Sequence, residues 1–234
     1  MQFHIVTIFP EAFTSYLNTS ILKRGQNKGA VSFDFFNPRD YTQDKHRKVD
    51  DAPYGGGPGM VMKAEPIIRA VEAIKSKVES HKVHKVIKSI KSKVVILSPA
   101  GKQFTNKLAE SWSNKYENIT LICGHYEGID ARVKKILKAE EISVGPYTLT
   151  GGELASLVII DAVTRRVPDV LGKEESIEEK RISSSEVYTR PEVIPYKNKK
   201  YKAPKVLLSG HHQKIDEWKR PKLSTDHARP ALDK

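Results

Sequence analysis

The strongest constraint on the fold of this chain is an alternation of short apolar runs with segments of helical periodicity. Residues 94–97 and 119–123 are short runs rich in β-branched and other apolar side chains. Each run is followed by a polar or glycine-containing turn and then by apolar residues at helical spacing, over residues 104–112 and 129–137. Strands that alternate with helices are typical of a parallel sheet with helices on both faces, so the sequence predicts an α/β fold.

The N-terminal part of the chain adds further elements to this pattern. We expect a strand over residues 3–9, a helix over 11–22, a second strand over 31–36 and another helix over 64–74. The stretch between them, residues 37–60, has no sustained period and contains three prolines and four glycines. A loop of that length in a compact domain tends to be either functional or disordered.

One segment, residues 143–166, places glycine-containing turns directly before an apolar helix that ends in Arg165 and Arg166. Its glycines lack a Cβ atom, so their backbone can approach a ligand closely. In parallel sheets, ligands bind at the carboxyl ends of the strands. Residues 97–101, 123–128 and 144–152 all fall at such ends, and we expect these three segments to converge on one binding site.

Composition and charge narrow the class of protein. The chain has 234 residues, which favours one large or two unequal domains. It contains no apolar run long enough to span a membrane and its first residues lack the features of a signal peptide, so we expect a cytoplasmic protein with no membrane partner. The single Cys123 excludes an internal disulfide and a cysteine-based zinc site. The net charge of +12 predicts either a polyanionic partner or a solvated, lysine-rich surface.

Two segments differ from the rest in composition. Residues 76–93 are rich in lysine, which indicates an exposed excursion or, alternatively, an auxiliary nucleic-acid contact. Residues 172–187 are charged and serine-rich without a hydrophobic face, which is typical of a linker. The chain is therefore divided into a domain of residues 1–171, this linker and a small basic domain of residues 188–234, expected to be mainly helical, with a helix at 213–220.

Several common active-site signatures are absent from the sequence. There is no G-x-G-x-x-G after a strand, no Walker A lysine motif and no G-x-S-x-G elbow. His211 and His212 are adjacent, so they do not share a helix face, and no carboxylate completes a set of ligands. We expect no metal site.

The motifs of the chain nevertheless resemble a known family. YGGGPGM, LSPAG, CGHYEGIDARV, SVGPYTLTGGE, IDAVTRR, YTRPE and LLSGHH occur in the order typical of the bacterial tRNA (guanine-37-N1)-methyltransferases, the TrmD family. The resemblance covers almost the whole chain. It implies an α/β-knot (SPOUT) fold with a deep trefoil knot, an obligate homodimer whose active sites are built across the dimer interface, and S-adenosylmethionine as methyl donor. It also implies tRNA, rather than DNA, as the nucleic-acid partner and N1 of guanosine 37 as the methyl acceptor.

The resemblance also implies which residues contact the donor, and glycine-bearing loops suit this ligand because backbone groups can surround it without bulky side chains. On that basis Gly145→Val or Gly152→Val should abolish donor binding and leave the fold intact. The implied contacts are Leu97, Ser98, Pro99, Gly124, Tyr126, Glu127, Val144, Gly145, Pro146, Tyr147, Thr148, Leu149, Gly151 and Gly152.

Methylation of guanine N1 requires loss of the N1 proton to a base, and a cation to stabilise the negative charge that develops on O6. By resemblance the cation is Arg165, whereas Arg166 suits a role at the helix C-terminus. The family usually places an aspartate in the linker, but this chain has Lys180 at that position. Lysine is normally protonated at neutral pH and cannot act as a base. Glu179 is therefore the candidate base, Glu178 is the second candidate, and both could instead be solvated linker charges.

The resemblance implies two further groups of residues in tRNA binding. Arg39, Asp50 and Gly59 lie in the early loop that helps to close over the target base, and the residues after position 187 contact the tRNA backbone, which positions the substrate without reading its sequence. Lys180 leaves open a catalytically impaired, knotted RNA-binding protein, while the last two motifs argue against a methyltransferase for another RNA. The implied tRNA-binding residues are Arg39, Asp50, Gly59, Tyr188, Arg190, His211, His212, Lys214 and Lys219.

Overall fold

The computed structural model describes residues 1–83, 91–171 and 186–220 and divides the chain into two compact units, Met1–Gly172 and Lys173–Lys234. The first unit is built on a five-stranded sheet of order β2-β1-β6-β5-β7, in which all neighbouring strands are parallel. The bounds of these strands are β1 Gln2–Val6, β2 Ser32–Phe36, β5 Ser92–Gln103, β6 Asn118–Ile122 and β7 Glu140–Ser143.

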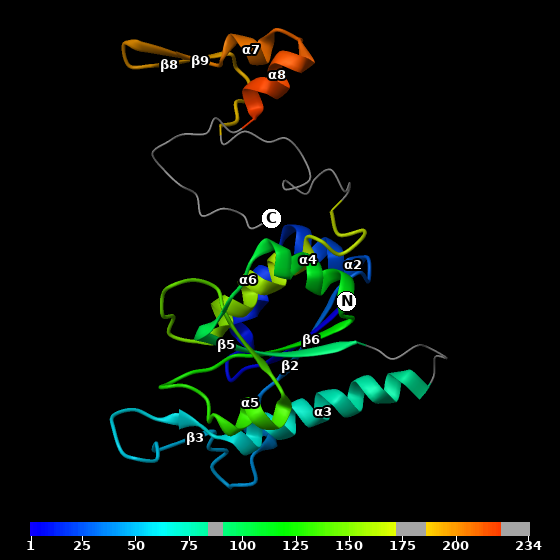
Figure 1. The fold of residues 1–234 in the computed structure, drawn as a ribbon, viewed down its shortest axis with the longest axis vertical. Coiled ribbons are helices and arrows are strands. Elements are labelled where there is room, and N and C mark those ends of the chain that lie inside the picture. Colours follow the sequence, from blue (N-terminus) through cyan, green and yellow to red (C-terminus); the bar gives the residue numbers. More distant parts are fainter. Residues whose placement is uncertain (84–90, 172–185, 221–234) are drawn as a thin grey trace. The chain divides into compact units, whose positions relative to one another are not determined.

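Helices cover both faces of the sheet, as the sequence predicts. One face carries α2, α4 and α6 and the other carries α3 and α5 (Figure 1). The strands supply both layers because their side chains alternate: Ile5 and Leu121 belong to the core under α4 and α6, whereas Val6 and Ile122 belong to the core under α3. The helices of this unit are α1 Thr14–Leu17, α2 Ser20–Asn27, α3 Ala64–Val83, α4 Asn106–Lys115, α5 Arg132–Leu137 and α6 Gly152–Thr164, with short 3-10 turns at Pro10–Phe13 and Pro38–Tyr41.

Three sequence-based boundaries in this unit are wrong. The helix expected over residues 11–22 is interrupted, because Thr19 is extended with φ −117° and ψ 144° and Ser20 takes a left-handed φ of 47°. Residues 97–101 lie within β5 rather than in a loop. However, Leu97 and Lys102 both pair with Ile142, so the residues between them bulge out of the ladder.

The lysine-rich segment is the third correction. Its first part continues α3 as far as Val83, and Lys77 on that helix forms an ion pair with Asp34. Its last part begins β5, where Lys93 is paired with Glu140 and lies over the ring of Trp112. The two ends of the segment are therefore structured parts of the domain, and residues 84–90 lie outside the described residues.

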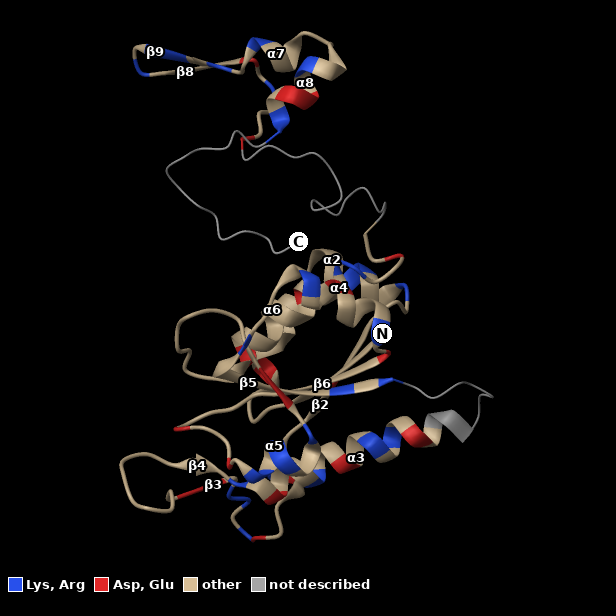
Figure 2. Ribbon diagram, viewed as in Figure 1, with Lys and Arg blue, Asp and Glu red and all other residues tan. Residues whose placement is uncertain are grey.

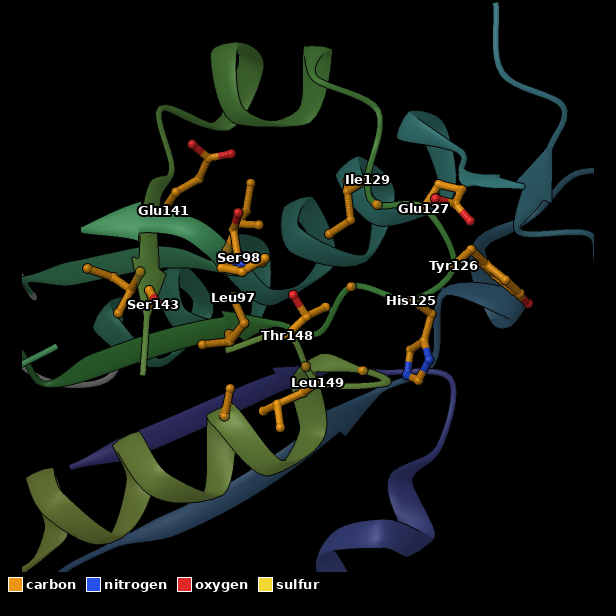
Figure 3. Close-up of a pocket in the computed structure, with 18 of the residues that line it drawn as sticks. Leu97, Ser98, His125, Tyr126, Glu127, Ile129, Glu141, Ser143, Thr148 and Leu149 are labelled. Carbon is orange, nitrogen blue, oxygen red and sulfur yellow. The ribbon is translucent and has the colours of Figure 1, made fainter. Parts of the chain in front are cut away.

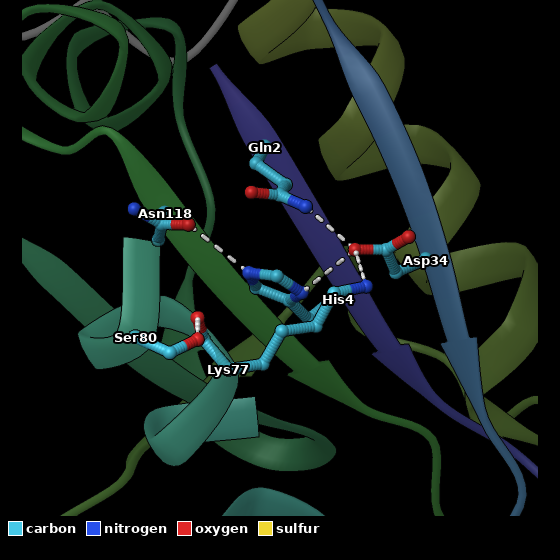
Figure 4. A network of polar contacts seen from close by, with 6 residues as sticks. All are labelled: Gln2, His4, Asp34, Lys77, Ser80 and Asn118. Carbon is cyan, nitrogen blue, oxygen red and sulfur yellow. Dashed lines mark hydrogen bonds and ion pairs between the residues drawn. The ribbon is translucent and has the colours of Figure 1, made fainter. Parts of the chain in front are cut away.

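A buried polar network joins α3 to the edge of the sheet (Figure 4). His4 on β1 is fully buried, its Nε2 lies 3.0 Å from Asn118 Oδ1, and its Nδ1 lies 3.5 Å from Asp34 Oδ2. Asp34 also accepts hydrogen bonds from Gln2 at 2.6 Å and from Lys77 at 3.0 Å. Burial lowers the pKa of His4, so the ring is neutral at neutral pH, and its hydrogen bond is with Asn118 on β6. The link from the sheet to α3 is the contact between Asp34 and Lys77.

The loop between β2 and α3 contains a small antiparallel pair, β3 Asp50–Asp51 with β4 Val61–Met62. Between these strands the four glycines, Gly55, Gly56, Gly57 and Gly59, all have positive φ, and Tyr54 is 99% exposed. No helix in the described part of the chain is long and apolar enough to cross a membrane.

The second unit contains an antiparallel hairpin of β8 Val193–Tyr196 and β9 Lys199–Lys202, followed by helices α7 Lys205–Leu208 and α8 His212–Lys219. The helix expected over 213–220 is present as α8, but the hairpin was not predicted. The chain turns through residues 197 and 198, where Lys197 takes a left-handed φ of 52°.

Candidate active site

A pocket of about 440 Å³ lies where the carboxyl ends of β5, β6 and β7 meet (Figure 3). Its walls come from the bulge of β5, from the loop that follows β6 and from the loop between β7 and α6. These are the three segments that the sequence predicts to converge.

All but two of the residues that the resemblance implies as donor contacts line this pocket; the exceptions are Gly145 and Pro146. Ser143 fixes the backbone beside the first of these, because its hydroxyl donates to Gly145 O at 2.9 Å. The implied contacts that line the pocket are Leu97, Ser98, Pro99, Gly124, Tyr126, Glu127, Val144, Tyr147, Thr148, Leu149, Gly151 and Gly152.

Charged side chains give the pocket an acidic balance. The carboxylates of Glu127, Asp130 and Glu141 line it, against the ammonium group of Lys134. Hydrogen bonds from the guanidinium of Arg132 lower the pKa of Asp130, so this carboxylate is ionised at neutral pH. Asp130 is ion-paired with Arg132 and Glu141 with Lys134, so the acidic character of the pocket comes mainly from Glu127.

The loop after β6 is held in an unusual conformation by its neighbours. Tyr126 has a φ of 60°, a left-handed value that is costly for a residue with a side chain. Backbone hydrogen bonds fix the loop to the segment before it: Glu127 N donates to Met60 O at 3.0 Å and Met62 N donates to Gly128 O at 2.9 Å. This pairing brings the predicted Gly59 to the pocket loop, since a Cβ atom there would lie 2.5 Å from the side chain of Glu127.

A polar pair at the edge of the pocket was missed by sequence reasoning: His125, which lines the pocket and is partly buried, and the buried Glu153. His125 Nε2 lies 2.7 Å from Glu153 Oε2, and Thr7 Oγ1 donates to Glu153 Oε1 at 2.6 Å. Gly151 packs against this pair so closely that a Cβ atom would lie 2.3 Å from the ring of His125. The pair thus joins the end of β1, the pocket loop and the first turn of α6. The available sequence signal was a glutamate, Glu153, in the first turn of an otherwise mainly apolar helix.

Gly152, unlike Gly145, is needed for packing as well as for the pocket. A Cβ atom at Gly152 would lie 2.6 Å from the Cα of Cys123 and 2.9 Å from the nitrogen of Gly124, so α6 contacts the end of β6 backbone to backbone. At Gly145 the neighbour is the ring of Tyr147, a side chain that is 53% exposed and can rotate away. The structure therefore argues against the expectation that Gly152→Val leaves the fold intact.

We expect Gly152→Val to destabilise the protein by about 1–3 kcal/mol or more, the usual range for overpacking a close contact. The melting temperature should fall by several degrees. Gly145→Ala is the matched control and should melt like the wild type. Differential scanning calorimetry of both variants checks this, and an unchanged melting temperature for Gly152→Val would contradict the packing argument.

The remaining predicted residues of the first unit lie away from the pocket lining. Arg39 is in the 3-10 turn Pro38–Tyr41, and Asp50 pairs with Met62 in the small sheet. Arg165 is half-buried at the C-terminal cap of α6, where its nitrogen donates to Asp161 O, and neighbouring Arg166 donates to Ala162 O.

The length of α6 separates Arg165 from the pocket. The helix begins at the pocket with Gly152 and has 13 residues, so its two ends are about 20 Å apart. One chain therefore does not bring its own Arg165 to its own pocket.

The predicted residues of the second unit are on its surface. Tyr188, Arg190, His211, His212 and Lys214 are exposed and Lys219 is half-buried. The ring of Tyr188 lies 6.1 Å from that of Trp218. The candidate bases Glu178 and Glu179, and Lys180 beside them, lie outside the described residues.

The described residues offer neither a reactive thiol nor a cluster of metal ligands. Cys123 is buried, which raises the pKa of its thiol, so it is unreactive. Within residues 1–83, 91–171 and 186–220, no group of three or more His, Cys, Asp or Glu side chains could hold a metal ion.

Comparison with known proteins places this arrangement in a family. The family model described as tRNA (Guanine-1)-methyltransferase TrmD matches residues 1–234. A tRNA (guanine-N(1)-)-methyltransferase of Carboxydothermus hydrogenoformans is 49% identical over 224 residues, which is 94% of this chain and 81% of the relative.

Relatives with the same name in other bacteria are similar to nearly the whole chain. The protein of Clostridioides difficile is 44% identical over 94% of this chain and 91% of its own length. That of Caldicellulosiruptor saccharolyticus is 46% identical over 99% of this chain and 90% of its own length. With the parallel sheet and the pocket at its carboxyl edge, these matches show that the chain belongs to the tRNA (guanine-1)-methyltransferase TrmD family.

Proposed function

We propose that this protein transfers a methyl group from S-adenosylmethionine to N1 of guanosine 37 in tRNA. The observation that carries the proposal is the pocket at the carboxyl edge of the sheet, in a chain of the TrmD family whose pocket walls contain the motifs that suggested the reaction. The enzyme acts on tRNA in the cytoplasm in this proposal, and the trefoil knot implied by the resemblance stays a prediction.

The residues that line the pocket support S-adenosylmethionine as the proposed donor. S-adenosylmethionine supplies a methyl group on a positively charged sulfonium. Apolar side chains of Leu97, Ile129 and Leu149 offer surfaces for an adenine ring, and backbone groups of the glycine-rich turns offer hydrogen-bond partners. The carboxylate of Glu127 favours the positive charge of the sulfonium and amino groups.

The acceptor base needs two further groups from the protein. A carboxylate takes the proton from N1 of guanine, and we assign this role to Glu179 in the linker. The guanidinium of Arg165 stabilises the negative charge on O6. Arg39, Asp50, Gly59, Tyr188, Arg190, His211, His212, Lys214 and Lys219 are assigned to tRNA binding.

A homodimer would bring Arg165 to a pocket. Leu154 and Val158 on α6 are 61% and 49% exposed, and they lie four residues apart on one face of a helix whose other face is in the core. Exposed apolar side chains on such a helix are suited to a subunit interface. Packing of this face against a second copy would place Arg165 of one subunit near the pocket of the other.

Subunit complementation tests the dimer. We pair Arg165→Ala with Leu149→Arg, which fills the pocket from a partly exposed position in the loop before α6. Each variant alone should be inactive. A mixed dimer, isolated with two different tags, has one complete site if the sites are shared, and should show about half of the wild-type rate. An inactive mixed dimer, or an active monomer by sedimentation, would contradict the shared site.

Mass spectrometry of the product tests the function itself. Unmodified tRNA is incubated with the protein and S-adenosylmethionine, and the digested RNA is mapped for methylguanosine. We expect one methyl group at N1 of guanosine 37, and none when that guanosine is replaced. Binding of tRNA without any methylation would favour the catalytically impaired RNA-binding protein instead.

A further inference from the structure

The hairpin β8–β9 of the second unit presents a surface that none of the roles above uses. All four residues of β9 are exposed, as are Ile194, Pro195 and Tyr196 of β8. Residues 193–202 contain four lysines, Lys197 in the turn and Lys199, Lys200 and Lys202 in β9, and no acidic residue. The ribbon of β9 and the adjacent turn is coloured largely as lysine (Figure 2).

The pairing of the two strands sorts their side chains by face. Ile194 is opposite Tyr201 and Tyr196 is opposite Lys199, so these side chains share one face of the hairpin. The other face carries Lys200 and Lys202, opposite Pro195 and Val193. One face is therefore mainly aromatic and apolar, with lysines around it.

The aromatic face of the hairpin is open to a ligand. Tyr196 is 61% exposed, Tyr201 is 55% exposed and Ile194 is 54% exposed. Lys197 in the turn lies over the ring of Tyr196, with its Nζ 5.6 Å from the ring centre. Aromatic rings flanked by ammonium groups suit a ligand with flat π faces and negative charges at a regular spacing, which is the chemistry of unpaired nucleotides.

We propose that the β8–β9 hairpin binds unpaired nucleotides of the RNA substrate, with bases stacked on Tyr196 and Tyr201 and phosphates held by Lys197, Lys199, Lys200 and Lys202. The inference rests on the proposed function for the identity of the RNA. The rings have to contact bases that are not already stacked in a duplex, so the site is a loop of the tRNA rather than a stem.

Binding measurements without donor test the proposal, because they do not depend on methylation. Affinity for unmodified tRNA is measured by fluorescence anisotropy for Tyr196→Ala/Tyr201→Ala and for Tyr196→Phe/Tyr201→Phe. The alanine pair should bind at least about tenfold more weakly, since stacking on one ring is worth roughly 1–3 kcal/mol. The phenylalanine pair keeps both rings and should bind like the wild type.

A lysine series keeps the test valid if the alanine pair perturbs the hairpin. Changing Lys199 and Lys200 to Gln should reduce the slope of log affinity against log salt by about 0.7 for each phosphate that the variant no longer neutralises. The same charge change at Lys23 and Lys107, two exposed lysines on α2 and α4, should leave the slope unchanged. If the Lys199/Lys200 variant and the Lys23/Lys107 variant had equal slopes, the change would reflect only the net charge of the protein, and the proposal would be overturned.

The outcomes separate this site from the proposed function. Wild-type affinity in the alanine pair overturns the hairpin site, even if the enzyme methylates tRNA. Weaker binding by the alanine pair, in a protein that methylates nothing, supports the hairpin site and refutes the proposed function. A change in sedimentation with unchanged RNA affinity would identify the aromatic face as a protein contact, and would also overturn the proposal.

Discussion

Replacing Arg165 with alanine is expected to lower the single-turnover rate of methyl transfer by about 10²- to 10³-fold, the usual cost of removing one group that stabilises a developing anion. The negative charge that forms on O6 of guanine has no other cation assigned to it in our proposal. Donor affinity should stay at the wild-type value, because the contact assigned to Arg165 is with O6 of guanine and not with the donor.

Arg166→Ala is the matched control for this prediction. Arg166 has the same charge and adjoins Arg165, but its guanidinium donates to Ala162 O at 2.6 Å, at the C-terminal end of α6. Its removal should cost a favourable interaction with the helix carbonyls and leave the rate within a fewfold of the wild type. Equal decreases in rate for the two variants would show a general effect of positive charge at this end of α6. That result would contradict a specific role of Arg165 in stabilising the charge on O6.

The layers of the first unit could be predicted because they follow from local patterns. Runs such as residues 119–123 are too short for helices and too apolar for loops, and the helical segments between them require parallel pairing. The bulge in β5 could not be predicted in this way. Its residues Ser98, Pro99 and Gly101 have the composition of a turn, and only the pairing with β7 reveals that the strand continues.

The parts of the site formed by glycine-containing backbone could be predicted from the sequence. The contacts between residues that are far apart in the sequence could not. Glycines after strands indicate a close approach of backbone to ligand, and these segments do converge on one pocket. The contact between His125 and Glu153 joins residues 28 positions apart, and periodicity carries no information about such a pair. Similarly, Arg165 is close to the pocket motifs along the sequence, but in space the length of α6 separates it from them by about 20 Å.

The hairpin β8–β9 could not be predicted, because its sequence is dominated by lysines. Its lysines are typical of a solvated tail, and its apolar residues are too few to predict a strand from alternation alone. The turn at residues 197 and 198 needs a left-handed Lys197, a conformation that its sequence does not favour. Pairing of the two strands, rather than local preference, therefore determines this element.

Glu179→Gln is expected to reduce single-turnover methylation by about 10²-fold or more, the usual scale for removal of a general base. If the enzyme is active, the N1 proton of guanine has to go to some acceptor. Arg165 cannot accept it, because a guanidinium stays protonated at any pH the protein experiences. By the resemblance, Lys180 stands at the position of an aspartate, and an ammonium group has no free lone pair to take the proton.

The carboxylate nearest to that position in the sequence is Glu179, and our proposal therefore assigns the base to it. Catalytic contacts often form only in the complex, so this assignment does not require the carboxylate to adjoin the pocket in the free protein. Glu178→Gln is the matched control. It removes the same charge one residue further from Lys180, and its effect should be milder. Donor affinity, measured by calorimetry, should be unchanged in both variants. A wild-type rate for Glu179→Gln would move the base elsewhere, whereas a decrease confined to this variant would assign the proton transfer to a glutamate that replaces the family's aspartate from the neighbouring position.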